Sequence, residues 1–456
     1  MESINPATEE ILKTFENHSK EQVEQALSQA AATFRRWRKY SLEDRAIPLK
    51  KAASCLREHR SRSAGIMTSE MGKPIVEAEA EIEKCAWNCE YYAEHAHRYL
   101  KDDPRDSSAT ESYVQYTPLG VILAIMPWNF PFWQVFRFAA PALMAGNTCI
   151  LKHASNVPQC ALAIEEVFRE SGFPDGTFRA LLIPGTDTAG LIESPHVAAV
   201  TLTGSEGAGS ATANAAGRML KKTVLELGGS DPFIVMEDAD VAAAARTGVR
   251  ARYQNTGQSC IAAKRFIIMD AVWSEFVERF LDGVRALKVG DPMDRETRIG
   301  PLARRDLVDE LDRQVRESVA CGARVLLGGR RHGTRGYYYE PTVLSEVSLH
   351  SPAASEEVFG PVAALIRVRN EEDAIRVANS CDYGLGANLW TNDLARARRL
   401  ARDIEAGQVF INGMVASDPR LPFGGIKRSG YGRELSEFGI REFVNIQTVW
   451  IGPPRL

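Results

Sequence analysis

The segment Val121–Met126 reads VILAIM and is the first of five short apolar runs that decide the fold of the first half of the chain. The other four are CILK (149–152), FRALLI (178–183), AAVTLT (198–203) and TVLEL (223–227). Helical patterns separate them, as in Pro158–Ser171. Because buried strands that alternate with helices form parallel sheets, this pattern predicts a doubly wound α/β domain.

A second series of apolar runs predicts a second doubly wound α/β domain, joined to the first near Gly228–Gly229. Helices are expected before the first series, over residues 19–60 and about 66–100, with Ser19 as an N-cap. The tail FVNIQTVWI (443–451) alternates like a strand beyond both series, so it can pair outside its own domain. The second series comprises PFIVMED (232–238), RFIIMD (265–270), ARVLLGG (323–329), AALIRV (363–368) and QVFING (408–413).

Composition narrows the class of protein. The chain has 456 residues, 45% hydrophobic and 25% charged, which suits two or three globular domains. A formal charge of −4 offers no basic excess for nucleic acid. The N-terminus lacks a basic and apolar leader, and prolines interrupt the uncharged stretch Ser112–Phe136, so we expect neither a secretory signal nor a membrane span.

The cysteine pattern argues against metal and disulfides. The eight cysteines form no C-x-x-C pair, and no histidine cluster accompanies them. Neither a zinc site nor a disulfide framework is therefore expected. We expect no metal and a cytoplasmic location.

Cys260 and Glu226 are candidates for a nucleophile and a base. Cys260 ends the run QNTGQSC, whose small and polar residues are unusual around a core cysteine, although a buried structural thiol is the alternative. Glu226 ends the run TVLEL, and the carboxyl ends of parallel strands form the crevice where such sheets bind ligands. A carboxylate desolvated there could act as a base, and a solvated turn residue is the alternative.

Two loops carry further candidates. Asn129 lies in PWNFP (127–131), where a rigidly held amide could donate to an oxyanion or could simply bond turn backbone. The run GSEGAG (204–209) follows a strand and opens a helix, which favours phosphate binding at the helix N-terminus. It does not match G-x-G-x-x-G, so a strict dinucleotide fingerprint is absent.

Seven motifs in one order resemble the aldehyde dehydrogenase superfamily over essentially the whole chain: PWNFP, LK-x-x-S, TLTGS, LELGG, GQSC, EEVFGPV and PFGGIKRSG. The resemblance implies a Rossmann-like NAD(P)-binding domain over residues 1–110 and 119–226 and a catalytic domain over 227–430. It implies an oligomerisation arm of residues 111–118 and 440–456 that pairs subunits into a homodimer or a dimer of dimers.

The same resemblance implies a mechanism. Cys260 would attack the aldehyde carbon, and the Asn129 side chain and the Cys260 N–H would hold the oxyanion of the thiohemiacetal. Hydride transfer to the nicotinamide would leave a thioester, and Glu226 would activate water for its hydrolysis. A thiol with an ordinary pKa of about 8.5 is mostly protonated at neutral pH, so the site has to lower that pKa or supply a base.

By resemblance, the cofactor is held by residues spread over the first half and the EEVFGPV motif. Ser155 replaces the Glu of many NAD-preferring relatives, which removes a carboxylate that would repel a 2′-phosphate and leaves Lys152 free to pair with it. We therefore expect NADP to be preferred and NAD to be tolerated. The implied contacts are Glu357 and Lys152 to the two riboses, Gly204 and Ser205 to the pyrophosphate, Phe359 near the ring, and Trp128 along the channel.

Within the superfamily the chain most resembles bacterial and cyanobacterial succinate-semialdehyde dehydrogenases. The resemblance implies that Arg137 binds the substrate carboxylate with Ser417 as a second contact. Gln254 stands where some relatives place another carboxylate-binding Arg, which leaves open a broader range of semialdehydes or neutral aldehydes. A cofactor-independent cysteine hydrolase or acyltransferase and a CoA-acylating dehydrogenase are the rival functions, and Glu357 and Glu226 respectively argue against them.

Overall fold

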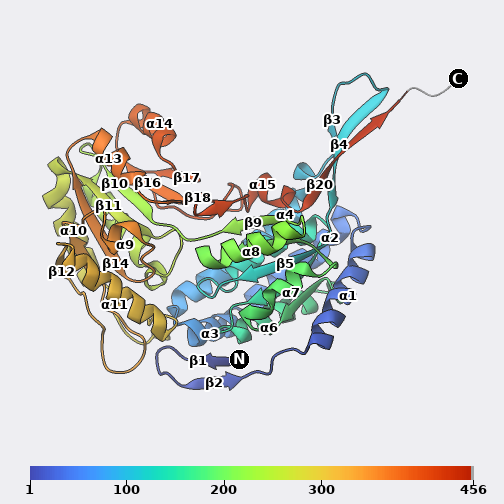
Figure 1. Cartoon of the computed structure of the whole chain (residues 1–456), viewed down its shortest axis with the longest axis horizontal. Helices are drawn as coiled ribbons and strands as arrows, with labels where there is room; N and C mark the ends of the chain where they lie inside the picture. The colour runs from blue at the N-terminus through green and yellow to red at the C-terminus, as the bar shows by residue number, and fades with distance from the viewer. Residues whose placement is uncertain (453–456) are drawn as a thin grey trace.

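The computed structural model describes residues 1–452 and has two α/β lobes with a β-ribbon projecting from one of them (Figure 1). The first lobe holds a six-stranded sheet in the order β19-β9-β8-β5-β6-β7, parallel except at β19. Its strands are β5 (Val121–Met126), β6 (Thr148–His153), β7 (Phe178–Leu181), β8 (Val197–Thr203), β9 (Lys222–Glu226) and β19 (Gly430–Tyr431).

The second lobe holds a seven-stranded sheet in the order β12-β13-β14-β11-β10-β16-β17, parallel except for the β12–β13 pair. The expected doubly wound α/β fold is confirmed. Two strands of this second sheet, β13 and β16, were not among the predicted apolar runs. The strands are β10 (Asp231–Val235), β11 (Ala263–Met269), β12 (Arg324–Leu327), β13 (Thr342–Ser345), β14 (Val362–Val368), β16 (Gly386–Trp390) and β17 (Gln408–Ile411).

The helices before the first sheet agree with the sequence pattern. Ser19 forms a capping box with Gln22 at the start of α1, as an N-cap serine does. The long helix α4 packs against both α2 and α5. These helices are α1 (Lys20–Trp37), α2 (Leu42–Glu58), α3 (Arg60–Met71), α4 (Ile75–Tyr99) and α5 (Trp133–Met144).

Most of the remaining helices connect strands within the two lobes, whereas α15 joins the first sheet to the projecting ribbon (Figure 1). Each lobe has its own buried hydrophobic cluster, because each sheet needs apolar side chains from the helices that cover it. The helices are α6 (Pro158–Glu170), α7 (Thr188–Glu193), α8 (Glu206–Arg218), α9 (Val241–Tyr253), α10 (Trp273–Arg285), α11 (Arg305–Ala320), α12 (Pro352–Ser355), α13 (Glu371–Ala378), α14 (Leu394–Asp403) and α15 (Ser436–Arg441).

The C-terminal part of the chain returns to the first lobe at two places. Gly430 in β19 pairs with Glu226, and a Cβ at Gly430 would lie 2.1 Å from the carbonyl oxygen of Leu225, so the position requires glycine. Beyond it, β20 (Val444–Ile451) pairs with β4 (Glu111–Pro118) in the projecting ribbon (Figure 1). The tail therefore pairs with a strand more than 300 residues earlier, outside the second sheet.

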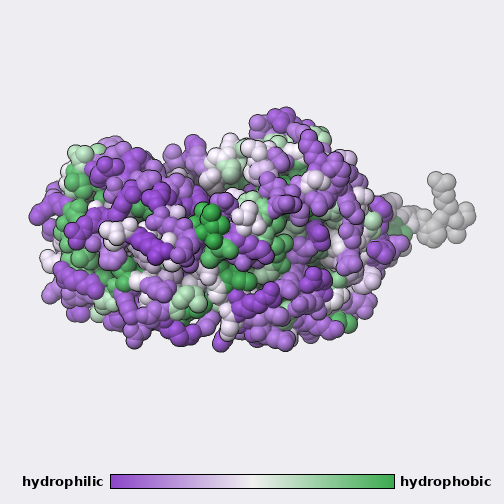
Figure 2. Space-filling model, turned by 90° about the horizontal axis from the view of Figure 1, so that it is seen from below, coloured by the Kyte–Doolittle hydropathy of each residue, from purple (hydrophilic) through white to green (hydrophobic). Residues whose placement is uncertain are grey.

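Short strands complete the fold. Among the helices of the described residues, none has both the length and the hydropathy of a membrane span. The molecular face in Figure 2 is mostly hydrophilic, with apolar residues gathered near its middle. Residues 453–456, the end of the predicted arm, lie outside the described residues. The short strands are β1 (Glu2–Ile4), β2 (Ile11–Thr14), β3 (Asp103–Pro104), β15 (Tyr383–Gly384) and β18 (Ile426–Lys427).

Candidate active site

A cavity of about 630 Å³ opens on Cys260. Its lining comes from α4, α5, α9 and the loops around residues 259–262, 297–298 and 414–417, so both lobes contribute to it. Of the predicted site residues, Cys260, Arg137, Gln254 and Ser417 belong to this lining. Asn129 and Glu226 are not part of it, and both are almost fully buried.

A strained turn places Cys260 at the cavity. Asn255 and Thr256 have φ angles of 54° and 55°, which non-glycine residues rarely adopt. The N–H of Asn255 donates to Oε2 of Glu77 at 2.6 Å, and the Thr256 hydroxyl accepts the N–H of Gly300 at 3.0 Å. Because backbone strain of this kind persists only where the surroundings enforce it, these contacts fix the position of the partly exposed thiol.

The Asn129 side chain is held from both ends. Its Oδ1 accepts Nε2 of Gln134 at 3.0 Å, and its Nδ2 donates to the carbonyl of Gln258 at 3.1 Å. These bonds fix the amide orientation next to the Cys260 turn and use one of the two Nδ2 hydrogens. The second hydrogen is left for an oxyanion, so the donor role of Asn129 stays a prediction.

Glu226 ends β9 and takes part in a buried ion cluster. Nη2 of Arg137 lies 3.1 Å from Oε2 of Glu226 and 2.6 Å from Oε2 of Glu434, and all three side chains are at most 5% exposed. Arg137 also donates to the hydroxyl of Thr203 at 3.1 Å. The predicted substrate anchor therefore already shares its charge with two carboxylates, and Glu434 is a site residue that the sequence analysis did not identify.

The electrostatics around Cys260 favour the protonated thiol. Burial raises the pKa of Cys260 well above its ordinary value, and the negative charge of Glu226 raises it further, whereas Arg137 acts in the opposite direction. Of the two alternatives left by the sequence, a lowered pKa or a supplied base, the structure favours a base. Glu226, whose charge acts on the Cys260 thiol, is the candidate for that base.

Glu357 and Cys260 are linked through Lys264. The Lys264 ammonium donates to the carbonyls of Ser259 and Cys260 at 2.9 and 2.8 Å and lies 3.7 Å from Oε1 of Glu357. The same Glu357 oxygen accepts the N–H of Gly229 at 2.9 Å. Sequence analysis missed Lys264, although a lysine four residues after the nucleophile, at the start of an apolar strand, was a usable signal.

The predicted cofactor contacts surround the carboxyl ends of the first sheet. The Trp128 and Phe359 rings pack edge to face with their centroids 5.7 Å apart. Ser205 caps α8 and accepts the N–H of Ala208, whereas the N–H of Gly204 donates to the Glu226 carbonyl at 3.0 Å. The Gly204 N–H is therefore occupied, and the free donors of this helix N-terminus come after it.

Lys152 and Ser155 lie at the end of β6. The Lys152 side chain is largely buried, and burial lowers its pKa. Ser155 is exposed in the turn before α6. Among residues 1–452, no carboxylate lies within 4 Å of the Lys152 ammonium. This pair therefore presents one cation and one neutral hydroxyl, and its role toward a 2′-phosphate stays a prediction.

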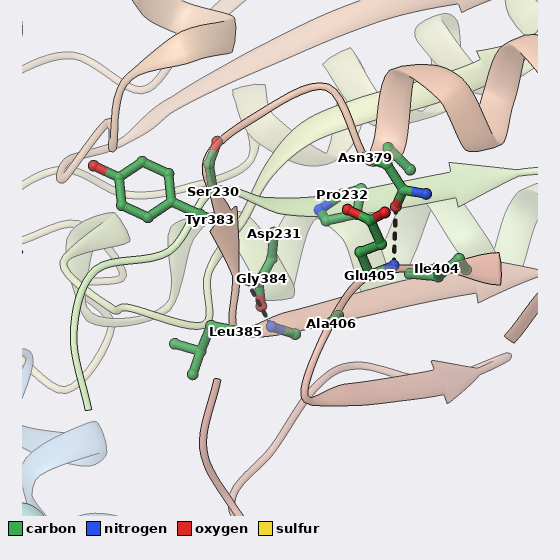
Figure 3. A pocket seen from close by; sticks show the side chains of 12 residues that line it. Ser230, Asp231, Pro232, Asn379, Tyr383, Gly384, Leu385, Ile404, Glu405 and Ala406 are labelled. Carbon is green, nitrogen blue, oxygen red and sulfur yellow. Dashed lines mark hydrogen bonds between the residues drawn. The ribbon is translucent and has the colours of Figure 1, made fainter. Parts of the chain in front are cut away.

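A second, smaller hollow lies at the start of β10 (Figure 3). Oδ1 of Asp231 accepts the N–H of Gly386 at 3.0 Å, and Oδ1 of Asn379 accepts the N–H of Glu405 at 2.9 Å. Burial raises the pKa of Asp231 to about 7. These polar groups fasten chain turns together, and none of the predicted site residues lines the hollow, so we assign the chemistry to the larger cavity.

The chain belongs to the aldehyde dehydrogenase family, whose model matches residues 1–449. It is 54% identical over 449 residues to the "Probable succinate-semialdehyde dehydrogenase [NADP(+)]" of Synechocystis sp., which covers 98% of this chain and 99% of the relative. It is 51% identical over 452 residues to "Succinate-semialdehyde dehydrogenase [NADP(+)] 1" of Mycobacterium bovis, with 98% and 99% covered. The predicted family is thereby confirmed.

A solved structure is similar over the same length. The succinic semialdehyde dehydrogenase of Streptococcus pyogenes, in complex with NADP+ as the cofactor, superposes with a TM-score of 0.97 at 39% identity. The match covers 99% of this chain and 100% of that one. The fold of both lobes is therefore that of an aldehyde dehydrogenase.

Proposed function

We propose that this protein oxidises succinic semialdehyde to succinate with NADP+ as the preferred cofactor and NAD+ as a tolerated one. The observation that carries the proposal is the charge of the cavity at Cys260. A substrate with a terminal carboxylate suits a cationic cavity, and the named relatives support the same substrate. The lining contains Lys84, Arg246, Arg250 and Arg298 against Glu77 and Glu81, in addition to Arg137, whose charge is offset by Glu226 and Glu434.

The first half of the reaction uses Cys260, Glu226 and Asn129. Glu226 accepts the thiol proton as the Cys260 sulfur forms a bond to the aldehyde carbon, and the carbonyl π electrons move to the oxygen. The resulting oxyanion is stabilised by the free Asn129 Nδ2 hydrogen and by the Cys260 N–H. Bound NADP+ supplies the acceptor for the hydride that leaves this carbon, and the carbon becomes the acyl carbon of a thioester.

The second half hydrolyses that thioester. Glu226 first releases the thiol proton to solvent and then accepts a proton from water as the water oxygen attacks the acyl carbon. The C–S bond breaks with its electron pair on sulfur, the Cys260 thiolate takes the proton back from Glu226, and the new carboxyl group ionises as succinate leaves. Arg137, which also pairs with Glu434, holds the Glu226 carboxylate at the end of β9 during both steps. Positioning of this kind keeps one base available for two successive proton transfers.

The residues present fit NADP. Lys152 is a buried cation without a carboxylate partner in the described part of the chain, and Ser155 beside it carries no charge that would repel a phosphate. The N-terminus of α8, with Ser205 as its cap, suits the pyrophosphate, and Trp128 and Phe359 form an aromatic wall. Glu357 would accept hydrogen bonds from the nicotinamide ribose.

We assign a different role to each lobe. We propose residues 1–110 and 119–226 as the cofactor domain and 227–430 as the catalytic domain. We propose residues 111–118 and 440–456 as the oligomerisation arm. Within it, β4 and β20 pair in the projecting ribbon, whose Ile446 and Trp450 are 63% and 55% exposed, and this favours contact between subunits of a homo-oligomer. All eight cysteines are free thiols, which suits a cytoplasmic location.

The test compares initial rates of cofactor reduction. Succinic semialdehyde, a longer semialdehyde and butanal are each assayed with NADP+ and with NAD+. We expect the largest kcat/KM for succinic semialdehyde with NADP+. Equal kcat/KM values for the three aldehydes would overturn the substrate assignment, and a larger kcat/KM with NAD+ would overturn the cofactor preference.

A further inference from the structure

Lys84 is a cation of the substrate cavity that the sequence analysis did not identify. It lies on α4, and its ammonium donates to the Ser417 hydroxyl at 2.7 Å across 333 residues of sequence. The ammonium also lies 4.2 Å from the ring centroid of Trp133. Lys84, Ser417 and Trp133 all line the cavity that opens on Cys260.

The Lys84 ammonium lacks an anionic partner within the described residues. Among residues 1–452, no carboxylate lies within 4 Å of it. The two nearby acids are occupied: Glu81 pairs with Lys73 and accepts two backbone N–H groups, and Asp418 pairs with Arg420. Lys84 is half-buried, and its partial burial and the positive charge of Arg137 lower its pKa to about 8.

The hydroxyl proton of Ser417 is available for a further hydrogen bond. Its oxygen accepts Nζ of Lys84 at 2.7 Å and Nε1 of Trp133 at 2.9 Å. A hydroxyl has two lone pairs and one proton, so both acceptor positions are used and the proton is left for another acceptor. Lys84 and Ser417 together present N–H and O–H donors at one place in the cavity wall.

Arg137, unlike Lys84, already has anionic partners. Its Nη2 already contacts Glu226 and Glu434, and the two carboxylates offset its positive charge. A substrate carboxylate placed against Arg137 would lie near both of these acids. The same carboxylate placed against Lys84 would supply the missing counter-charge.

We propose that Lys84, with the Ser417 hydroxyl, binds the terminal carboxylate of the aldehyde substrate and thereby determines the preference for semialdehydes. Arg137 primarily positions Glu226 and Glu434. This inference rests on the proposed function, since it assigns the residue that recognises the substrate's negative charge.

The experiment measures the ratio of kcat/KM for succinic semialdehyde to kcat/KM for butanal. In Lys84→Met this ratio should fall about 10- to 100-fold, the loss expected for one charge-assisted contact. Lys84→Arg should retain most of the ratio. The matched control is Arg246→Met, which removes one positive charge from the same cavity and should lower the ratio less than threefold.

The outcomes separate the two claims. A wild-type enzyme without preference for succinic semialdehyde would overturn the proposed function itself. A wild-type enzyme with the preference, and a Lys84→Met enzyme that keeps it, would overturn the Lys84 assignment alone. A fall in Arg246→Met as large as that in Lys84→Met would also overturn it, because cavity charge in general would then explain the selectivity.

A second measurement uses the unmodified protein in case Lys84→Met does not fold. An amine-reactive acylating reagent is applied with and without succinate, and the modified lysines are quantified by mass spectrometry. We expect succinate to slow modification of Lys84 at least fivefold relative to the exposed Lys50. Equal modification of Lys84 with and without succinate would contradict the proposal.

Discussion

Nη2 of Arg137 lies 3.1 Å from Oε2 of Glu226 in a site that excludes solvent from both side chains. The arginine comes from α5 and the glutamate from the end of β9, and Glu434 closes the cluster from the C-terminal part of the chain. Two carboxylates that share one guanidinium are stable in a buried site only while that guanidinium remains. This relationship links the placement of the proposed base to the stability of the fold.

Replacing Arg137 should therefore affect both stability and catalysis. We expect Arg137→Met to lower the free energy of unfolding by about 3–5 kcal/mol, the usual effect of leaving a buried charge unpaired. Activity should fall similarly for succinic semialdehyde and butanal, as measured by kcat/KM beside denaturant unfolding. A loss confined to succinic semialdehyde, with unchanged stability, would restore Arg137 as the principal carboxylate anchor.

Replacing Glu226 should separate the two half-reactions by pH. In Glu226→Gln both proton transfers lose their base, so the steady-state rate at pH 7 should fall about 10²- to 10⁴-fold. At pH 9 hydroxide can ionise Cys260, whose pKa also loses the contribution of the Glu226 charge. The first turnover of cofactor reduction should then be faster than at pH 7, and slow hydrolysis should follow it.

Stopped-flow measurement of cofactor reduction checks this prediction. Wild-type protein under the same conditions is the reference for the burst amplitude. A Glu226→Gln enzyme whose first turnover stays equally slow at pH 7 and pH 9 would show that Glu226 does not act as the base for the thiol.

Ser155→Glu should change the cofactor preference. The new carboxylate would repel the 2′-phosphate of NADP+ and could accept a hydrogen bond from the 2′-hydroxyl of NAD+. We expect kcat/KM for NADP+ to fall about 10- to 100-fold, the size of a lost charge-assisted contact, with kcat/KM for NAD+ unchanged or higher. Ser155→Gln is the neutral control of the same size, and an equal loss in it would point to a steric cause.

Glu77→Gln should alter how stability depends on pH. Burial raises the pKa of Glu77 from 4.5 to about 7. Because the folded state binds the proton more tightly than the unfolded state, Glu77 destabilises the protein progressively as pH rises from about 4.5 to 7. Gln keeps an acceptor for the Asn255 N–H without titrating, so the variant should be more stable than wild type at pH 8, by about 1–2 kcal/mol.

Thermal unfolding at pH 5 and pH 8 measures this effect. The difference between Glu77→Gln and wild type should be larger at pH 8 than at pH 5. Burial also raises the pKa of Glu434 to about 7, so stability should fall with pH even in the variant, although less steeply than in wild type. A difference between the proteins that does not change with pH would mean that Glu77 does not titrate in this range.

The strands could be predicted from the sequence where they form continuous apolar runs. The runs at 121–126 and 198–203 became central strands of the first sheet, because six or seven consecutive apolar or β-branched residues favour a buried strand. The strands β13 and β16 were missed because their segments, TVLS and GANLW, contain polar or small residues and form no continuous apolar run. Their assignment depends on pairing with β14 and β10, which is a tertiary contact.

The site was predictable where its chemistry lies in a contiguous motif. Cys260 and Asn129 carry recognisable flanking residues, so the amino-acid sequence alone was enough to name them. No sequence pattern marked Lys84 as a site residue, because a single lysine in a Glu-rich helix is typical of a solvent-exposed face. Only the packing of α4 against α5 and the 414–417 loop turns that side chain toward Ser417.

The sequence by itself therefore determined the two α/β domains, the family and the identity of the proposed nucleophile, oxyanion donor and base, since each depends on local pattern or motif. The tertiary structure decided which charges are already paired. Arg137 meets Glu226 and Glu434, whereas Lys84 meets a hydroxyl and an aromatic ring. Pairing of charges depends on distances between residues up to 333 positions apart, and burial makes those distances decisive by removing the water that would otherwise screen them.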